Sequence, residues 1–82
     1  MNSLEGKSAF ITGGSTGIGF GMASTFARAG MNVAITDIRD DELERAKSQL
    51  SDITSNVLAL NVDSTDLTAL NRAADEVSRN FG

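Results

Sequence analysis

The chain has 82 residues, enough for one small domain, and a formal net charge of −4. It contains no cysteine, which excludes a disulfide framework and fits a reducing compartment. No run approaches the ~18 apolar residues of a membrane span, and the first residues lack a signal-peptide core, so we expect a cytoplasmic protein. Residues 37–82 carry ten acidic and five basic side chains, which argues against nucleic acids and anionic membranes as partners.

Three apolar runs predict strands, at Ser8–Thr12, at residues 32–36 and at residues 56–62. The third run is too continuously apolar for a half-exposed antiparallel strand, so we expect it to be buried on both faces, as parallel strands are.

Each predicted strand is followed by a predicted helix. The first covers about residues 17–29, before Gly30, and its apolar stripe is predicted as Ile18, Met22, Phe26 and Ala29. The second opens at Asp40 or Asp41, where Asp41 and Glu44 resemble a capping box, and its inward face is predicted as Leu43, Ala46 and Leu50. The last begins near Thr65, and its apolar residues are Leu67, Leu70, Ala74, Val77 and Phe81.

Alternating strands and helices predict an α/β protein with a doubly wound, Rossmann-type parallel sheet, of which residues 1–82 supply the first three strand–helix units. Right-handed crossovers place the strands in the order 3-2-1, with the first two helices on one face. The chain reverses direction after the third strand, so the last helix is expected on the opposite face.

Five glycines, at positions 13, 14, 17, 19 and 21, crowd the junction between the first strand and the first helix. A helix N-terminus presents free N–H groups and the positive end of the helix dipole, which suit a phosphate. A mere connector needs one or two glycines. We therefore interpret the cluster as a phosphate-binding loop: Gly13 and Gly14 form the turn, Gly17 admits a pyrophosphate, and Gly19 lets the helix pack closely on the strand.

The loop lacks the Lys-Ser/Thr pair of a nucleotide-triphosphatase P-loop, because Phe20 and Gly21 follow Gly19. A dinucleotide-binding fold instead requires an acidic residue at the end of the second strand, ~20 residues on, to hold the adenosine ribose. Asp37 lies there, 18 residues after Gly19. An aspartate ending a strand can also serve as a turn residue or helix cap, but together with the glycine cluster the ribose role is favoured.

Residues 12–19 read Thr-Gly-Gly-Ser-Thr-Gly-Ile-Gly, which resembles the Thr-Gly-x-x-x-Gly-Ile-Gly signature of the short-chain dehydrogenase/reductase family. Residues 63–66 resemble the family's Asp-Val-Thr/Ser-Asp segment, with Ser64 where Val is usual. There the aspartate is implied to meet the adenine amino group, and residue 64 to bind through its backbone N–H. The resemblance covers the whole chain. It implies that the dinucleotide is bound by Gly13, Ser15, Thr16, Gly17, Ile18, Gly19, Asp37, Ile38, Asp63 and Ser64.

The family resemblance also implies an activity. A complete member transfers hydride between a nicotinamide and an alcohol or carbonyl substrate, commonly as a homo-oligomer. Its catalytic Ser and Tyr-x-x-x-Lys lie further along the chain than residue 82, and this sequence contains no tyrosine, so we expect a cofactor-binding half without catalytic residues. The alternative is a stand-alone nucleotide-binding or regulatory module. With neither His nor Cys, no transition-metal site is expected.

The expected cofactor is NAD rather than NADP. The Asp37 carboxylate suits two ribose hydroxyls and would repel a 2′-phosphate, and no basic residue lies in the glycine loop. Arg39 could turn toward a phosphate, but we interpret it as a solvated surface charge. Ile38 is expected to form a wall of the adenine site, although packing against the following helix is a close alternative.

Overall fold

The computed structural model describes residues 5–81; residues 1–4 and 82 of the predicted domain lie outside the described part. Strands and helices alternate as the sequence predicts, which confirms the α/β class. The elements are β1 (Ser8–Thr12), α1 (Gly17–Arg28), β2 (Asn32–Asp37), α2 (Asp40–Ser51), β3 (Val57–Asn61) and α3 (Leu67–Phe81).

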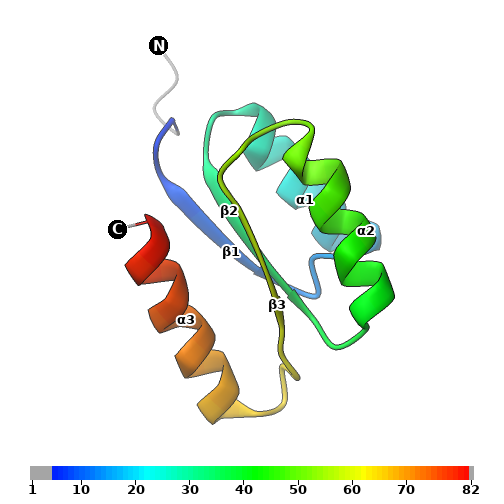
Figure 1. The fold of residues 1–82 in the computed structure, drawn as a ribbon, viewed down its shortest axis with the longest axis vertical. Helices are drawn as coiled ribbons and strands as arrows, with labels where there is room; N and C mark the ends of the chain where they lie inside the picture. Colours follow the sequence, from blue (N-terminus) through cyan, green and yellow to red (C-terminus); the bar gives the residue numbers. More distant parts are fainter. Residues whose placement is uncertain (1–4, 82) are drawn as a thin grey trace.

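The three strands form one parallel sheet in the order β1-β2-β3, which is the predicted 3-2-1 order. In its register Thr12 pairs with Thr36, and Asp37 pairs with Asn61. The carboxyl ends of all three strands therefore meet at one edge. Figure 1 shows α1 and α2 on one face of the sheet and α3 on the other, as right-handed crossovers require.

The main core lies between the sheet and the pair α1 and α2. The central strand β2 is buried from Val33 to Asp37, because it has a strand on either side. The predicted inward face of α2 is confirmed. The buried cluster consists of Ile11, Ala23, Ala27, Val33, Ile35, Leu43, Ala46 and Leu50.

Helix α1 presents a different face from the predicted one. Ile18 is 85% exposed and Met22 is 45% exposed, so the predicted apolar stripe is not the face that α1 buries, whereas Phe26 does pack against the core. The residues that α1 buries are Ala23, Ser24 and Ala27. At 3.6 residues per turn, Ala23 is rotated by about 100° from Met22, and its small side chain lets the helix lie close to the sheet.

The second and third units also differ from prediction in detail. Arg39 occupies the N-cap of α2 and Asp41 lies within the first turn, so the predicted capping box is wrong. Strand β3 is shorter than predicted and half-buried rather than buried on both faces, because it lies at an edge of the sheet.

Helix α3 begins at Leu67, two residues later than predicted. The Asp66 carboxylate accepts a hydrogen bond from the Ala69 N–H at 3.1 Å and so caps this end of the helix. Ala73 and Val77 are the buried residues of α3, whereas Leu67 is 71% exposed and Ala74 is also exposed. The predicted inward face is therefore right at Val77 and wrong at Leu67 and Ala74.

One buried polar atom in β2 gives a stability prediction. Thr36 is 1% exposed, and among the described residues its Oγ1 atom has no hydrogen-bond partner. Thr36→Val keeps the side-chain shape and removes the unsatisfied hydroxyl, so we expect the free energy of unfolding to rise by about 1 kcal/mol. Denaturant unfolding of the full-length protein measures it, with Thr36→Ser, which keeps the hydroxyl and loses the methyl group, expected to destabilise. A less stable valine variant would contradict this reading of Thr36.

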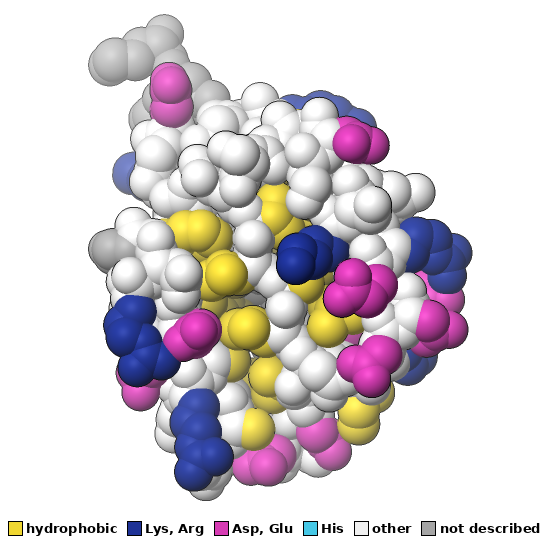
Figure 2. All heavy atoms as spheres, viewed as in Figure 1, with side chains coloured by type: hydrophobic (Ala, Val, Ile, Leu, Met, Phe, Trp, Pro, Cys, Tyr) yellow, Lys and Arg dark blue, Asp and Glu magenta, His cyan; other side chains and the backbone are white. Residues whose placement is uncertain are grey.

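The outer edge of β1 gives a prediction about association. Within residues 5–81, β1 pairs with β2 alone, and unpaired strand edges invite pairing with another chain. Figure 2 shows apolar side chains at the surface between α3 and α2, over the strands. We therefore expect the 82-residue chain, produced by itself, to self-associate in sedimentation velocity. A sharp monomer boundary together with cooperative thermal unfolding would argue against this.

Candidate functional site

The glycine loop joins β1 to α1 at the carboxyl edge of the sheet. Gly17, the first residue of α1, has φ = +60°, and a Cβ built there would meet no atom within 4 Å. A Cβ on Gly19 would lie 2.3 Å from the Gly13 carbonyl oxygen, so this glycine allows the helix to pack against the loop itself and not, as predicted, on the strand. Gly17 is thus needed for its backbone conformation and faces open space, whereas Gly19 is needed for a close contact.

The N-terminus of α1 is left open toward an anion. Thr16 occupies the N-cap without a side-chain capping bond, and the first turn contains no acidic residue. The first N–H groups of a helix have no acceptor within the helix. By contrast, the first turn of α2 holds Asp40, Asp41 and Glu42. The positive end of the α1 dipole therefore has no negative side chain of its own turn to balance it.

The loop is fastened to the end of β2 by two hydrogen bonds. The Ser15 hydroxyl donates to Asp37 Oδ2, and the Gly14 N–H donates to the Thr36 carbonyl oxygen at 3.1 Å. Ser15 and Asp37 are each 7% exposed. The structure therefore places the glycine loop and the strand-end carboxylate, which are 22 residues apart, in direct contact.

The groups around the Asp37 carboxylate favour its ionised form. Its Oδ1 atom accepts hydrogen bonds from the backbone N–H groups of Ile38 at 2.8 Å and Arg39 at 3.2 Å. The Arg39 side chain lowers the pKa of Asp37 well below its usual range; the bonds from Ser15 and the backbone act in the same direction, and burial acts against them. Asp37 is consequently ionised throughout the physiological pH range.

Arg39 is half-exposed, as expected of a surface charge, but it also contacts Asp37, which the sequence analysis did not predict. Its Nε atom lies 3.2 Å from Asp37 Oδ1, and its Nη2 atom lies 3.2 Å from Asp37 Oδ2 and 3.1 Å from Thr16 Oγ1. The arginine side chain is 52% exposed. One signal in the sequence was available, because residues two apart in extended backbone point to the same side. Arg39 is extended and stands two residues after Asp37.

Asn61 is a further residue that the sequence analysis missed. Its Nδ2 group donates to the Ile38 carbonyl oxygen at 3.3 Å and to the Asp40 carboxylate. The Val62 N–H donates to the Asp37 carbonyl oxygen at 3.1 Å. The end of β3 therefore fixes the segment that follows β2. The sequence signal that could have identified Asn61 is its position, because it is a polar residue that ends a strand at the same edge of the sheet as Asp37.

Ile38, Asp63 and Ser64 lie along the same edge, outside the contact between the loop and Asp37. Ile38 is 60% exposed and Ser64 is also exposed. Asp63 Oδ1 accepts hydrogen bonds from the Thr65 hydroxyl at 2.7 Å and the Thr65 N–H at 2.9 Å, which lower the Asp63 pKa. In the described part of the chain, Asp63 and Ser64 form no hydrogen bond with the glycine loop or with Asp37.

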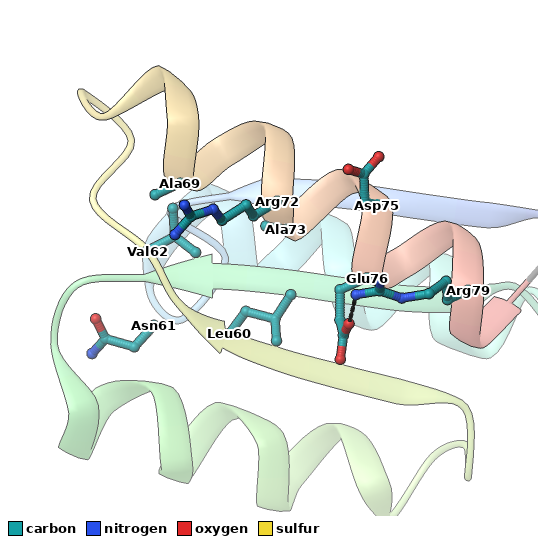
Figure 3. A pocket seen from close by; sticks show the side chains of 9 residues that line it. All are labelled: Leu60, Asn61, Val62, Ala69, Arg72, Ala73, Asp75, Glu76 and Arg79. Carbon is teal, nitrogen blue, oxygen red and sulfur yellow. Dashed lines mark hydrogen bonds and ion pairs between the residues drawn. The ribbon is translucent and has the colours of Figure 1, made fainter.

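A separate groove of about 460 Å³ lies between β3 and α3. Arg72, Asp75, Glu76 and Arg79 line it from α3, and Figure 3 shows Glu76 and Arg79 joined in an ion pair. None of the predicted cofactor-binding residues lines it. Residues 5–81 contain no group of three or more acidic, His or Cys side chains placed to hold a metal ion. None of the helices within that range is long and apolar enough to cross a membrane.

Comparison with known proteins shows which protein family this chain matches. A family model described as short chain dehydrogenase matches residues 7–82. The Cα-dehydrogenase of Sphingobium sp. (strain NBRC 103272 / SYK-6) is 38% identical over 82 residues, which make up all of this chain and 27% of that protein.

Two solved structures share the fold. The 3-ketoacyl-(acyl-carrier-protein) reductase of Brucella melitensis, complexed with NADH, has a TM-score of 0.86 and 36% identity, over 98% of this chain and 32% of its own. The L-sorbose reductase of Gluconobacter frateurii, complexed with NADPH and L-sorbose, has a TM-score of 0.87 and 32% identity, over 95% of this chain and 30% of its own. The chain thus spans about a third or less of the length of these three relatives.

Proposed function

The chain belongs to the short-chain dehydrogenase family, and from this premise we propose that it is the dinucleotide-binding part of an NAD-dependent oxidoreductase. Residues 1–82 then form the N-terminal part of a single NAD(P)-binding domain. In the full-length enzyme, hydride passes between the nicotinamide ring and the carbon of an alcohol or carbonyl substrate. The dinucleotide supplies the hydride chemistry, and the residues of this chain bind and orient it.

The contact between the glycine loop and Asp37 carries this proposal. The loop bears an uncapped helix N-terminus, and Ser15 holds it against a buried, ionised carboxylate. A pyrophosphate fits over residues 13–19, where N–H groups and the helix dipole stabilise negative charge. Asp37 then accepts hydrogen bonds from the hydroxyls of the adenosine ribose. The loop residues assigned to the pyrophosphate are Gly13, Ser15, Thr16, Gly17, Ile18 and Gly19.

The adenine ring is assigned to the segment that follows Asp37 and β3. Ile38 offers an exposed apolar wall beside the ribose site. Asp63 uses its Oδ1 atom for both bonds with Thr65, so in the described chain Oδ2 is the atom left for the adenine amino group. The Ser64 N–H is the second adenine contact in this proposal, and because it is a backbone group the change from Val to Ser matters little.

NAD is the preferred dinucleotide in this proposal. The carboxylate of Asp37 attracts ribose hydroxyls and repels a 2′-phosphate. The two solved relatives contain NADH and NADPH respectively, so family membership by itself leaves this choice to individual residues. Among the residues that the structure describes, Asp37 carries the charge that favours NAD.

The full-length protein, assayed with a panel of alcohols and carbonyl compounds, tests the proposed activity. We expect NAD-dependent turnover, read from the absorbance of the reduced nicotinamide. NAD binding without turnover of any substrate class would favour the stand-alone binding module instead. Absence of NAD and NADP binding would overturn the proposed function altogether.

A further inference from the structure

Asn61, the last residue of β3, holds the segment between β2 and α2 through its side-chain amide. Its Nδ2 group donates one hydrogen bond to the Ile38 carbonyl oxygen at 3.3 Å and one to the Asp40 carboxylate. Figure 3 shows this side chain reaching toward the ribbon that joins β2 to α2. An amide nitrogen carries two hydrogens, so these two acceptors use both of them.

The segment depends on such bonds because its apolar side chain is not packed. Ile38, proposed as a wall of the adenine site, is 60% exposed, so contacts with the core do not fix its position. The Val62 N–H donates to the Asp37 carbonyl oxygen at 3.1 Å, and the Asn61 amide adds a bond one residue further along the segment. Together these bonds set the separation between Ile38 and the adenine contacts proposed at residues 63 and 64.

The position of the Asn61 amide requires a hydrogen-bond donor. Both of its partners are acceptors, a carbonyl oxygen and a carboxylate. Aspartate has the shape of asparagine but no N–H group, so at position 61 it would set a second carboxylate against Asp40, and like charges at this range repel. The contact therefore depends on the chemistry of the side chain and not on its size.

We propose that Asn61 is a positioning residue for the adenine half of the dinucleotide: through Ile38 and Asp40 it keeps the wall of the adenine site in place before the ligand binds. This inference rests on the proposed function, because it takes Ile38 as part of the adenine site. A protein binds its ligand more weakly in proportion to the fraction of molecules that are in the binding-competent form. Releasing the segment therefore weakens binding without removing a group that touches the ligand.

Asn61→Asp in the full-length protein tests this role. The dissociation constants of NAD and of AMP, which carries the adenosine half alone, are measured by calorimetry. We expect both constants to rise about tenfold, because two hydrogen bonds that hold the segment are lost. Asn56→Asp is the matched control. Asn56 is exposed and precedes the other end of β3, so the same added charge there should leave both constants within about twofold of wild type.

The reciprocal exchange separates positioning from the added charge. Asn61→Asp combined with Asp40→Asn has the net charge of wild type and restores the bond between the two side chains with donor and acceptor reversed. The bond to the Ile38 carbonyl oxygen stays lost, so we expect a partial recovery of NAD and AMP affinity. An affinity no better than that of Asn61→Asp alone would contradict the proposal.

The outcomes separate this inference from the proposed function. A wild-type protein that binds neither NAD nor NADP overturns both. A wild type that binds NAD, with constants for Asn61→Asp within about twofold of those for Asn56→Asp, overturns the role of Asn61 alone. Should Asn61→Asp fail to fold by circular dichroism, Asn61→Ala decides, because it removes both bonds without adding a charge. We expect it to bind NAD severalfold more weakly, and an unchanged constant contradicts the proposal.

Discussion

Replacing Gly17 by valine is expected to abolish dinucleotide binding while leaving most of the helix content in place. Gly17 has φ = +60°, a conformation that a β-branched residue adopts only with strain. A Cβ at this position points into open space beside the loop, where the pyrophosphate is proposed to lie. We expect the NAD affinity of the full-length protein, measured by calorimetry, to fall about a hundredfold or more. Circular dichroism reports the helix content.

Gly21→Ala is the control for this variant. Gly21 lies within α1, is exposed, and a Cβ there would also meet no atom within 4 Å. It lacks a positive φ and lies outside the loop, so NAD affinity should be unchanged and the helix slightly more stable. If Gly17→Val retained its NAD affinity, the assignment of the glycine loop to the binding site would be wrong.

Asp37→Ala combined with Ile38→Arg is expected to move the preference of the enzyme from NAD toward NADP. The first change removes the acceptor for the ribose hydroxyls and the charge that repels a 2′-phosphate. The second adds a cation where Ile38 is now exposed. Loss of hydrogen bonds to a charged group costs about 1.5–3 kcal/mol, which corresponds to a tenfold to hundredfold weaker use of NAD. The ratio of kcat/KM values for the two dinucleotides measures the shift.

Asp52→Ala provides the comparison. Asp52 follows the far end of α2 and is exposed, so removing its charge should leave the ratio unchanged. A wild-type enzyme that already uses NADP better than NAD would show that Asp37 has been misread.

The fold was predictable because its determinants are local and repetitive. Apolar runs located the three strands, and the handedness of the crossovers then gave the order and the faces of the helices. The packing face of α1 was not predictable from hydropathy. Ile18 and Met22 are more apolar than Ala23 and Ala27, yet the alanines face the core, because close approach to the sheet favours small side chains.

The parts of the candidate site that belong to a sequence motif were predictable. The contacts that depend on backbone conformation and strand register were not. The glycine spacing and Asp37 pointed to one edge of the sheet, and the structure joins them through Ser15. The partner of Arg39 depends on the extended backbone after β2, which composition and charge runs do not reveal. The role of Asn61 depends on the register between β2 and β3, which pairs it with Asp37.

The most direct test of the central claim is a crystal structure of the full-length protein bound to NAD. We predict the pyrophosphate over residues 13–19, with the adenosine ribose hydroxyls about 3 Å from the Asp37 carboxylate. A dinucleotide bound elsewhere, or one whose adenosine ribose lies away from Asp37, would contradict this account.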